Sequence, residues 1–181
     1  MRSRSGKPDG YGAEGRQMKS PTYSHKQLRT VLARTKTVAM VGVSLNEVRP
    51  SFFVARYLRQ KGFSVLPVNP RYAEKKAFGS KVYASLDAIP KKRDPIQMVD
   101  IFRRSEDAGA VVDEALEVLG NRGLETIWMQ IGVIDHKAAK RAEKKGVTVI
   151  MNHCPKIEYQ RLWGELSWGG INSGVVSSKM W

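Results

Sequence analysis

Short apolar runs rich in β-branched residues alternate along this chain with longer segments in which apolar residues recur every three or four positions. The runs are typical of strands buried on both faces of a parallel sheet, and the longer segments are typical of helices that cover such a sheet. The alternation therefore predicts right-handed βαβ units. The predicted strands are 38–41, 63–68, 82–83, 98–102, 126–129 and 147–150.

Residues that favour helix starts precede most of the periodic segments. Ser24, Ser105 and Asp135 are predicted N-caps, and Pro50 suits the first turn of a helix. Two shorter helices are predicted around 85–88 and 156–163. The fold class that follows is α/β: a Rossmann-like, doubly wound parallel sheet in a three-layer α/β/α arrangement.

The segment from the first strand to the helix that begins at Pro50 has the order strand, glycine, polar loop, helix. Gly42 allows a tight turn, and the N–H groups at the helix start face whatever lies above the strand end. Such a start binds anions, so we interpret the segment as a site for a phosphate-bearing ligand, with Arg49 as a nearby cation. An ordinary βα turn without a ligand is the alternative.

Five polar clusters fall where predicted strands end. Parallel strands end at the same edge of a sheet, and ligands of open α/β sheets bind at that edge. The clusters therefore indicate one site. They are 44–49, 69–71, 103–104, 130–132 and 152–154.

The fingerprint of an NAD site is incomplete. The pattern G-x-G-x-x-G would need two further glycines, where the chain has Ser44 and Glu47. The second strand lacks the acidic residue that binds the ribose of NAD, and Arg71, Lys75 and Lys76 follow it instead. Cations at this place suit a phosphorylated ribose, either the 2′-phosphate of NADP or the 3′-phosphate of coenzyme A. Plain NAD is disfavoured.

Six motifs, in matching order and spacing, resemble a known family: VGVSLNEVRPSFFVARYL, VLPVNP, KVYASLDAIP, VDIFRR, WMQIG and NHCPKIE. This is the family of small CoA-binding proteins, which consist of little more than the CoA-binding domain also found in the α subunit of succinyl-CoA synthetase. The resemblance covers residues 25–163 and implies a Rossmann-like domain that binds coenzyme A, usually with no assigned catalytic activity. Residues 95–98 depart from the family's pattern, which leaves the start of that strand open.

The resemblance also implies binding residues for each part of coenzyme A. Gly42, Ser44, Asn46 and Arg49 would meet the phosphates, Pro67, Val68 and Asn69 would border the adenosine, Phe102 and Arg103 would line the cleft, and Gln130 and Gly132 would face the pantetheine arm.

Cys154, the single cysteine of the chain, follows the last predicted strand at the same edge. In one hypothesis, Lys156 and a protonated His153 favour its thiolate, which attacks the disulfide form of coenzyme A to give a mixed disulfide and release one coenzyme A thiolate. In the other, Cys154 is a small buried apolar residue. No acid is spaced to orient His153, so no catalytic residue is identified, and no spacing suits a structural zinc. Asp100 is expected to bond backbone groups near its strand end.

Positive charge is concentrated at the start of the chain. Of the net charge of +14, residues 1–36 carry +7, from nine Lys or Arg and two acids. We expect a disordered basic segment over 1–24, the CoA-binding domain over 25–163, and a Gly- and Trp-containing tail over 164–181. The tail either packs on the domain or contacts a partner, for instance in a homo-oligomer.

Composition also bears on location. The chain has no run of about 20 apolar residues, so we expect no membrane span. A single cysteine suits a reducing compartment, and we expect a cytoplasmic protein, with a mitochondrial presequence as the alternative.

Three function classes stay open. The first is a module that binds coenzyme A or an acyl-CoA without turnover. The second is an enzyme, either an NADP-dependent oxidoreductase or an acyl-CoA ligase-type subunit. The third is a nucleic-acid binder that uses the basic N-terminal segment, for which we expect weak, salt-sensitive and sequence-blind binding at most.

Overall fold

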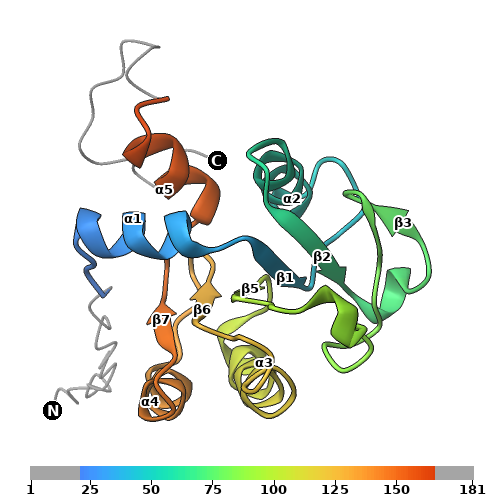
Figure 1. Ribbon diagram of the computed structural model, residues 1–181. Helices are drawn as coiled ribbons and strands as arrows, with labels where there is room; N and C mark the ends of the chain where they lie inside the picture. The colour runs from blue at the N-terminus through green and yellow to red at the C-terminus, as the bar shows by residue number, and fades with distance from the viewer. Residues whose placement is uncertain (1–20, 166–181) are drawn as a thin grey trace, which may run out of the picture.

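A five-stranded parallel sheet forms the centre of the computed structural model, which describes residues 21–165 (Figure 1). The strand order is β2-β1-β5-β6-β7. Each strand lies within one residue of its predicted bounds. A strand buried on both faces is apolar at nearly every position, so its ends are visible in the sequence. The strands are β1 (Thr37–Val41), β2 (Ser64–Val68), β5 (Met98–Ile101), β6 (Thr126–Met129) and β7 (Thr148–Ile150).

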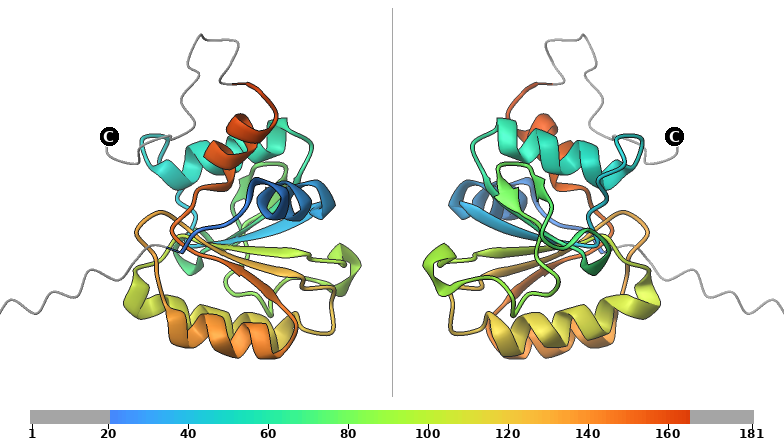
Figure 2. Two further views of the ribbon diagram at one scale, coloured as in Figure 1. Left: turned by 90° about the vertical axis from the view of Figure 1, so that its left-hand side faces the viewer. Right: turned by 90° about the vertical axis from the view of Figure 1, so that its right-hand side faces the viewer.

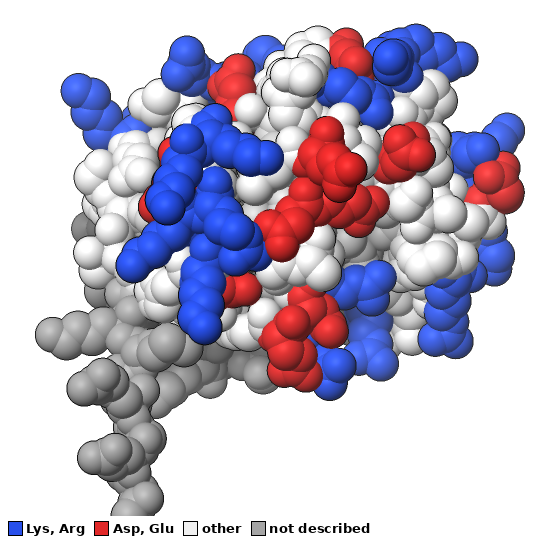
Figure 3. Space-filling view, turned by 90° about the horizontal axis from the view of Figure 1, so that it is seen from below, with Lys and Arg blue, Asp and Glu red and all other residues white. Residues whose placement is uncertain are grey.

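Helices cover both faces of this sheet, so the predicted three-layer, doubly wound fold is confirmed (Figures 1 and 2). One face carries α1 (His25–Arg34), α2 (Pro50–Gln60) and α5 (Pro155–Leu162). The other carries α3 (Ser105–Val118) and α4 (His136–Lys144), which lie side by side. Viewed from outside this second layer, acidic residues gather over α3 and basic residues over α4 (Figure 3).

The core consists of two apolar clusters, one on each side of the sheet. In β1, Ala39 and Val41 belong to the cluster under α3 and α4, whereas Val38 and Met40 belong to the cluster under α1, α2 and α5. This is the period-two alternation of a strand. Trp128 of β6 is fully buried in the second cluster, where its Nε1 donates to the His153 carbonyl at 2.8 Å.

The chain between β2 and β5 crosses the edge of the sheet in short elements. They are η1 (Pro70–Tyr72), the hairpin β3 (Lys76–Ala77) and β4 (Ser80–Lys81), and η2 (Lys91–Arg93). The strand predicted at 82–83 is reduced to one parallel bridge between Tyr83 and Val68. Counting it as a strand gives six strands in the order 3-2-1-4-5-6 of the doubly wound Rossmann fold. Ligands of this fold bind at the point where the strand order reverses, between β1 and β5.

Two local predictions were wrong. Residues 85–88 form a turn rather than a helix, with Ala88 N–H donating to Ser85 Oγ at 3.3 Å, because so short a segment cannot offset the cost of helix nucleation. Ser105 is the first residue of α3 and not its cap. The N-cap residue is Arg104, whose side chain makes no capping hydrogen bond. The predicted caps Ser24 and Asp135 are confirmed, with bonds of 3.1 Å and 2.9 Å to N–H groups of the first turn.

The described ends of the chain lie against the domain. Tyr23 OH accepts from Met151 N–H at 2.8 Å, which joins the chain before α1 to the end of β7. Glu165 accepts from Tyr57 OH at 2.6 Å and pairs with Lys61 of the region after α2. The rest of the predicted segment 1–24 and of the tail 164–181 lies outside the described residues. None of the described helices is long and apolar enough to span a bilayer.

Candidate functional site

The segments that follow the five strands are joined by backbone hydrogen bonds at one edge of the sheet, as the polar clusters predicted. The bonds run from β2 across to β7, so residues far apart in sequence meet there. Each is an N–H donating to a carbonyl of the neighbouring strand: Gly42 to Val68 at 2.8 Å, Phe102 to Val41 at 2.8 Å, Gln130 to Ile101 at 3.4 Å, and His153 to Met129 at 3.4 Å.

Gly42 is the tightest point of this edge. Its φ of +88° is a left-handed conformation, and a Cβ placed on it would lie 2.3 Å from the Phe102 carbonyl oxygen and 3.2 Å from Arg103 Nε. Only glycine fits there without displacing backbone. The guanidinium of Arg103 therefore lies directly beside the glycine turn and supplies a cation at the point of closest approach.

The loop between Gly42 and α2 is shaped by its own side chains. Ser44 Oγ accepts from Asn46 N–H at 3.1 Å, and Asn46 Oδ1 accepts from Val48 N–H at 3.1 Å. Ser44 N–H in turn donates to the buried Ser51 Oγ at 3.0 Å, a contact that sequence reasoning missed. The side chains predicted to contact phosphate thus also order the loop that carries them.

The start of α2 is the helix N-terminus at which the sequence predicts anion binding. Pro50 occupies its first turn, and Arg49 is the N-cap residue with an exposed side chain that makes no capping bond. The helix dipole places partial positive charge at this end, next to the glycine turn. Arg49 is therefore available to contact an anion there.

Asn69 locks the end of β2 to the glycine loop. Its Nδ2 donates to the Val43 carbonyl at 2.8 Å and its Oδ1 accepts from Arg71 N–H at 3.1 Å. Pro67 and Val68 are buried, and the Val68 side chain belongs to the core, so the backbone of Val68 is the part that can border a ligand.

Tyr72 is a second residue that sequence reasoning missed. Its hydroxyl lies 3.5 Å from Ser44 Oγ. The guanidinium of Arg71 and the ammonium of Lys75 lie 5.7 Å and 5.8 Å from the centroid of its ring. The only sequence signal was its place among the cations after β2. It brings those cations close to the loop at Ser44.

The loops after β6 and β7 are tied to each other and to α3. Gly132 N–H donates to Asn152 Oδ1 at 2.7 Å, and its carbonyl accepts from Ser105 Oγ at 3.1 Å. Ser105 Oγ also accepts from Ile134 N–H at 3.1 Å, so the hydroxyl binds the loop after β6 instead of capping its own helix. Gly132 and the 41% exposed Ile131 consequently lie at the rim of the edge.

Residues 36–160 match the family model described as CoA binding domain. The chain belongs to the CoA-binding domain family. The uncharacterized protein YneT of Bacillus subtilis is 35% identical over 136 residues, which are 75% of this chain and 94% of YneT.

Two solved structures of similar proteins have the same fold. One is cell-free ID.343 from Thermus thermophilus, at 31% identity and a TM-score of 0.70, covering 77% of this chain and 99% of that one. The other is a hypothetical protein from Pyrococcus horikoshii OT3, at 32% identity and a TM-score of 0.70, covering 78% and 94%. Every predicted site residue, from Gly42 to Cys154, falls inside the segment matched by the family.

Within this CoA-binding domain, Gln130 is directed inward by a buried carboxyl group. Its Nε2 donates to both oxygens of Asp100, at 2.8 Å and 3.0 Å. Asp100 was expected to bond backbone and instead bonds this side chain. Burial raises the pKa of Asp100 to about 8, and the bond from Gln130 only partly opposes that effect.

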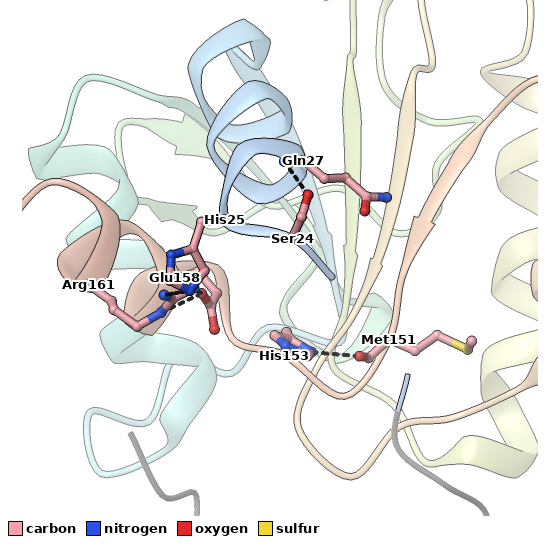
Figure 4. A network of polar contacts seen from close by, with 7 residues as sticks. All are labelled: Ser24, His25, Gln27, Met151, His153, Glu158 and Arg161. Atoms are coloured by element: carbon pink, nitrogen blue, oxygen red, sulfur yellow. Dashed lines mark hydrogen bonds and ion pairs between the residues drawn. The ribbon is translucent and has the colours of Figure 1, made fainter. Parts of the chain in front are cut away.

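Cys154 is 7% exposed and packs in the apolar cluster under α1, α2 and α5. Burial raises the pKa of its thiol to about 11. Lys156 lowers this pKa, as expected, but the effect of burial is larger, so the thiol stays protonated. The His153 ring bonds the Met151 carbonyl through Nδ1 at 2.8 Å (Figure 4). It also stands edge-on to the ring of Tyr23. It is therefore positioned by backbone and not by Cys154.

Arg161 joins the two helices that flank this region. It bonds Glu158 within α5 at 2.5 Å and His25 Nε2 of α1 at 2.7 Å (Figure 4). Among residues 21–165, no group of three or more His, Cys, Asp or Glu is arranged to hold a metal ion. The glycine turn, the cation beside it and the start of α2 are therefore the candidate site, and all three lie in the segment that matches the family.

Proposed function

We propose that this protein binds coenzyme A or an acyl-CoA at the carboxyl edge of its sheet, without turnover of its own. The observation that carries the proposal is the glycine turn at Gly42, where Arg103 lies beside bare backbone and Ser44 N–H, two residues on, bonds Ser51 in the first turn of α2. Backbone that only glycine can adopt, next to a cation and a helix N-terminus, is suited to a diphosphate. Membership of the CoA-binding domain family supports coenzyme A as the bearer of that diphosphate.

The cations divide into two groups that fit the two charged parts of coenzyme A. Arg103 lies at the glycine turn and Arg49 at the start of α2, and both would meet the diphosphate. Arg71 and Lys75, on either side of Tyr72, would meet the 3′-phosphate of the ribose. The backbone of Val68 and the side chain of Asn69 would then border the adenosine, and the loop at Gly132 the pantetheine arm.

The proposal of binding without turnover rests on the burial and the hydrogen bonds of the titratable groups near the site. Asp100 is fully buried behind Gln130, the Cys154 thiol is buried with a raised pKa, and the His153 ring bonds backbone. Each of these groups has a structural role, whereas acid–base chemistry requires a group within reach of the substrate.

Calorimetry with four ligands tests the proposal. Coenzyme A should bind more tightly than 3′-dephospho-CoA, because the latter lacks the phosphate that Arg71 and Lys75 would contact, and both should bind more tightly than NAD. NADP, which carries a phosphate on the other ribose hydroxyl, tests the oxidoreductase alternative. Binding of NAD or NADP equal to or tighter than that of coenzyme A would contradict the proposal.

Substitution of Arg49 tests the place of the diphosphate. Arg49→Ala should weaken coenzyme A binding by about 1–3 kcal/mol, the cost of a lost charge-assisted contact, and leave the Tm of the protein without added ligand nearly unchanged. Arg34→Ala is the matched control, since Arg34 is an exposed arginine that ends α1 at the opposite edge of the sheet. Equal affinities of the two variants would place the phosphates elsewhere.

A further inference from the structure

The outer surfaces of α3 and α4 carry opposite charge. All five charged residues of α3 are acidic, in a chain whose net charge is +14. The helix α4 contains four basic residues and one acidic residue, Glu143. The acids of α3 are Glu106, Asp107, Asp113, Glu114 and Glu117, and the cations of α4 are Lys137, Lys140, Arg141 and Lys144.

These charges gather in an acidic area and a neighbouring basic area on one face of the molecule (Figure 3). The buried side of each helix is apolar: alanine, valine and leucine in α3, and three alanines in α4. The positions opposite them are exposed and repeat at helical spacing. Glu106, Asp113 and Glu117 make the acidic row, and Lys137, Lys140 and Lys144 make the lysine row.

The two rows are only partly neutralised within one molecule. Arg141 makes a two-point contact with Asp113, at 2.8 Å for both bonds, and Arg104 pairs with Glu106 at 2.8 Å. Among residues 21–165, Glu117 and the three lysines of the row make no ion pair. The surface therefore presents unpaired charge of both signs to a partner.

The partner that fits this surface is a second copy of the same surface. Because α3 and α4 both return from parallel strands, they run in the same direction. A two-fold axis parallel to the helices and midway between them places each acidic row over the partner's lysine row. A two-fold axis across the helices would place α3 on α3, which like charges oppose.

We propose that two copies of this chain associate through the faces of α3 and α4 about the axis parallel to these helices. The Arg141–Asp113 contact shows which positions of the two helices are level with each other. One turn further on, Lys144 lies level with Glu117, so these two residues meet across the interface, twice in each dimer. The ligand site at the carboxyl edge stays open, since the interface covers the outer helix layer.

Association through exposed charges is screened by salt, because the Debye length falls from about 14 Å at 50 mM to about 4 Å at 500 mM ionic strength. Sedimentation velocity of the full chain should therefore show dimer at 50 mM NaCl and monomer at 500 mM NaCl. Monomer under both conditions, at protein concentrations up to several hundred micromolar, would overturn the proposal.

Reversing the charge of Lys144 or of Glu117, which lie at the same height along the two helices, tests the proposed pair. Lys144→Glu and Glu117→Lys should each weaken dimerisation about tenfold or more, because each puts like charges opposite each other at both contacts. An equimolar mixture of the two variants should dimerise again, since both contacts of the mixed dimer join opposite charges. Failure of the mixture to associate would overturn the proposal. The mixture would also fail to associate if a basic segment of the chain, and not the lysine row of a second copy, bound the acidic face of α3.

Two controls complete the experiment. Lys26→Glu makes the same charge change on an exposed residue of α1, on the other face of the sheet, and should dimerise like the unmodified protein. Circular dichroism and coenzyme A binding show that each variant is folded. Loss of dimer in Lys26→Glu would mean that net charge, and not the α3–α4 face, controls association.

Discussion

Asp100 lies in the central strand with no exposed surface, and its two oxygens accept from the amide of Gln130. Burial raises the pKa of this carboxyl group to about 8, so a large fraction of the folded protein keeps the proton at neutral pH. The unfolded chain releases that proton near pH 4. Between those values the folded state binds more protons than the unfolded state, and this group's contribution to stability falls as pH rises.

Asp100→Asn should remove this pH dependence and keep an oxygen that accepts from Gln130. The Tm of the variant relative to the unmodified protein should rise steadily from pH 5 to pH 8.5. Differential scanning calorimetry across this range measures it. Parallel Tm curves would mean that Asp100 is already ionised when folded.

Cys154 is the second residue whose chemistry is decided by burial. With its thiol pKa raised to about 11, the folded protein should react with a thiol-specific disulfide reagent at pH 8 far more slowly than a small free thiol. Full modification should follow unfolding in guanidinium chloride. An adduct on the folded protein with CoA disulfide, lost on reduction and absent from Cys154→Ser, would contradict this and restore the redox hypothesis.

At the scale of elements, the connection from β1 to α2 depends on Gly42 for two separate reasons. The positive φ strains any residue with a Cβ, and the Phe102 carbonyl leaves no room for that atom. Gly62, at the end of α2, has φ +89°, but a Cβ added to it would meet nothing within 4 Å, so it experiences only the first effect.

Alanine at these two glycines should therefore separate the two effects. Gly62→Ala should lower the free energy of unfolding by about 1 kcal/mol, from backbone strain alone. Gly42→Ala should cost about 3 kcal/mol or more and also weaken coenzyme A binding, because Phe102 and Arg103 must move. Urea denaturation of both variants measures the difference. Equal losses of unfolding free energy in the two variants would show that the backbone at Phe102 can move to make room for a Cβ at little cost.

At the scale of the whole molecule, the candidate site is assembled from segments between Gly42 and Asn152 that follow all five strands of the sheet. An unfolded chain cannot present these segments together, so a ligand of the site binds the folded state alone. Coenzyme A at 100 times its Kd should therefore raise the free energy of unfolding by about 2.7 kcal/mol.

Thermal unfolding at increasing coenzyme A concentration measures this stabilisation, and Arg49→Ala should need a higher concentration for the same shift. A Tm that does not depend on coenzyme A would contradict a site built from several strand ends.

Local features of the chain were enough to predict the layers of the fold. The runs at 38–41 and 126–129 are apolar throughout because both faces of their strands are buried, and such runs have few other interpretations. The caps Ser24 and Asp135 bond N–H groups three residues away, so their partners are visible in the sequence. Gly42 and Arg49 were identified for the same reason, as parts of one strand–turn–helix segment.

Tertiary structure alone decided the contacts between segments. Gln130 and Asp100 are 30 residues apart, and Tyr72 and Ser44 are 28 apart, so each pair meets only because the strand order places their segments side by side. Ser105 resembles a cap in sequence, but the loop at Gly132 competes for its hydroxyl. The acidic and lysine rows of α3 and α4 follow the same rule. The charge of each helix can be counted in the sequence, but the two helices lie side by side only because β5 and β6 are neighbours in the sheet.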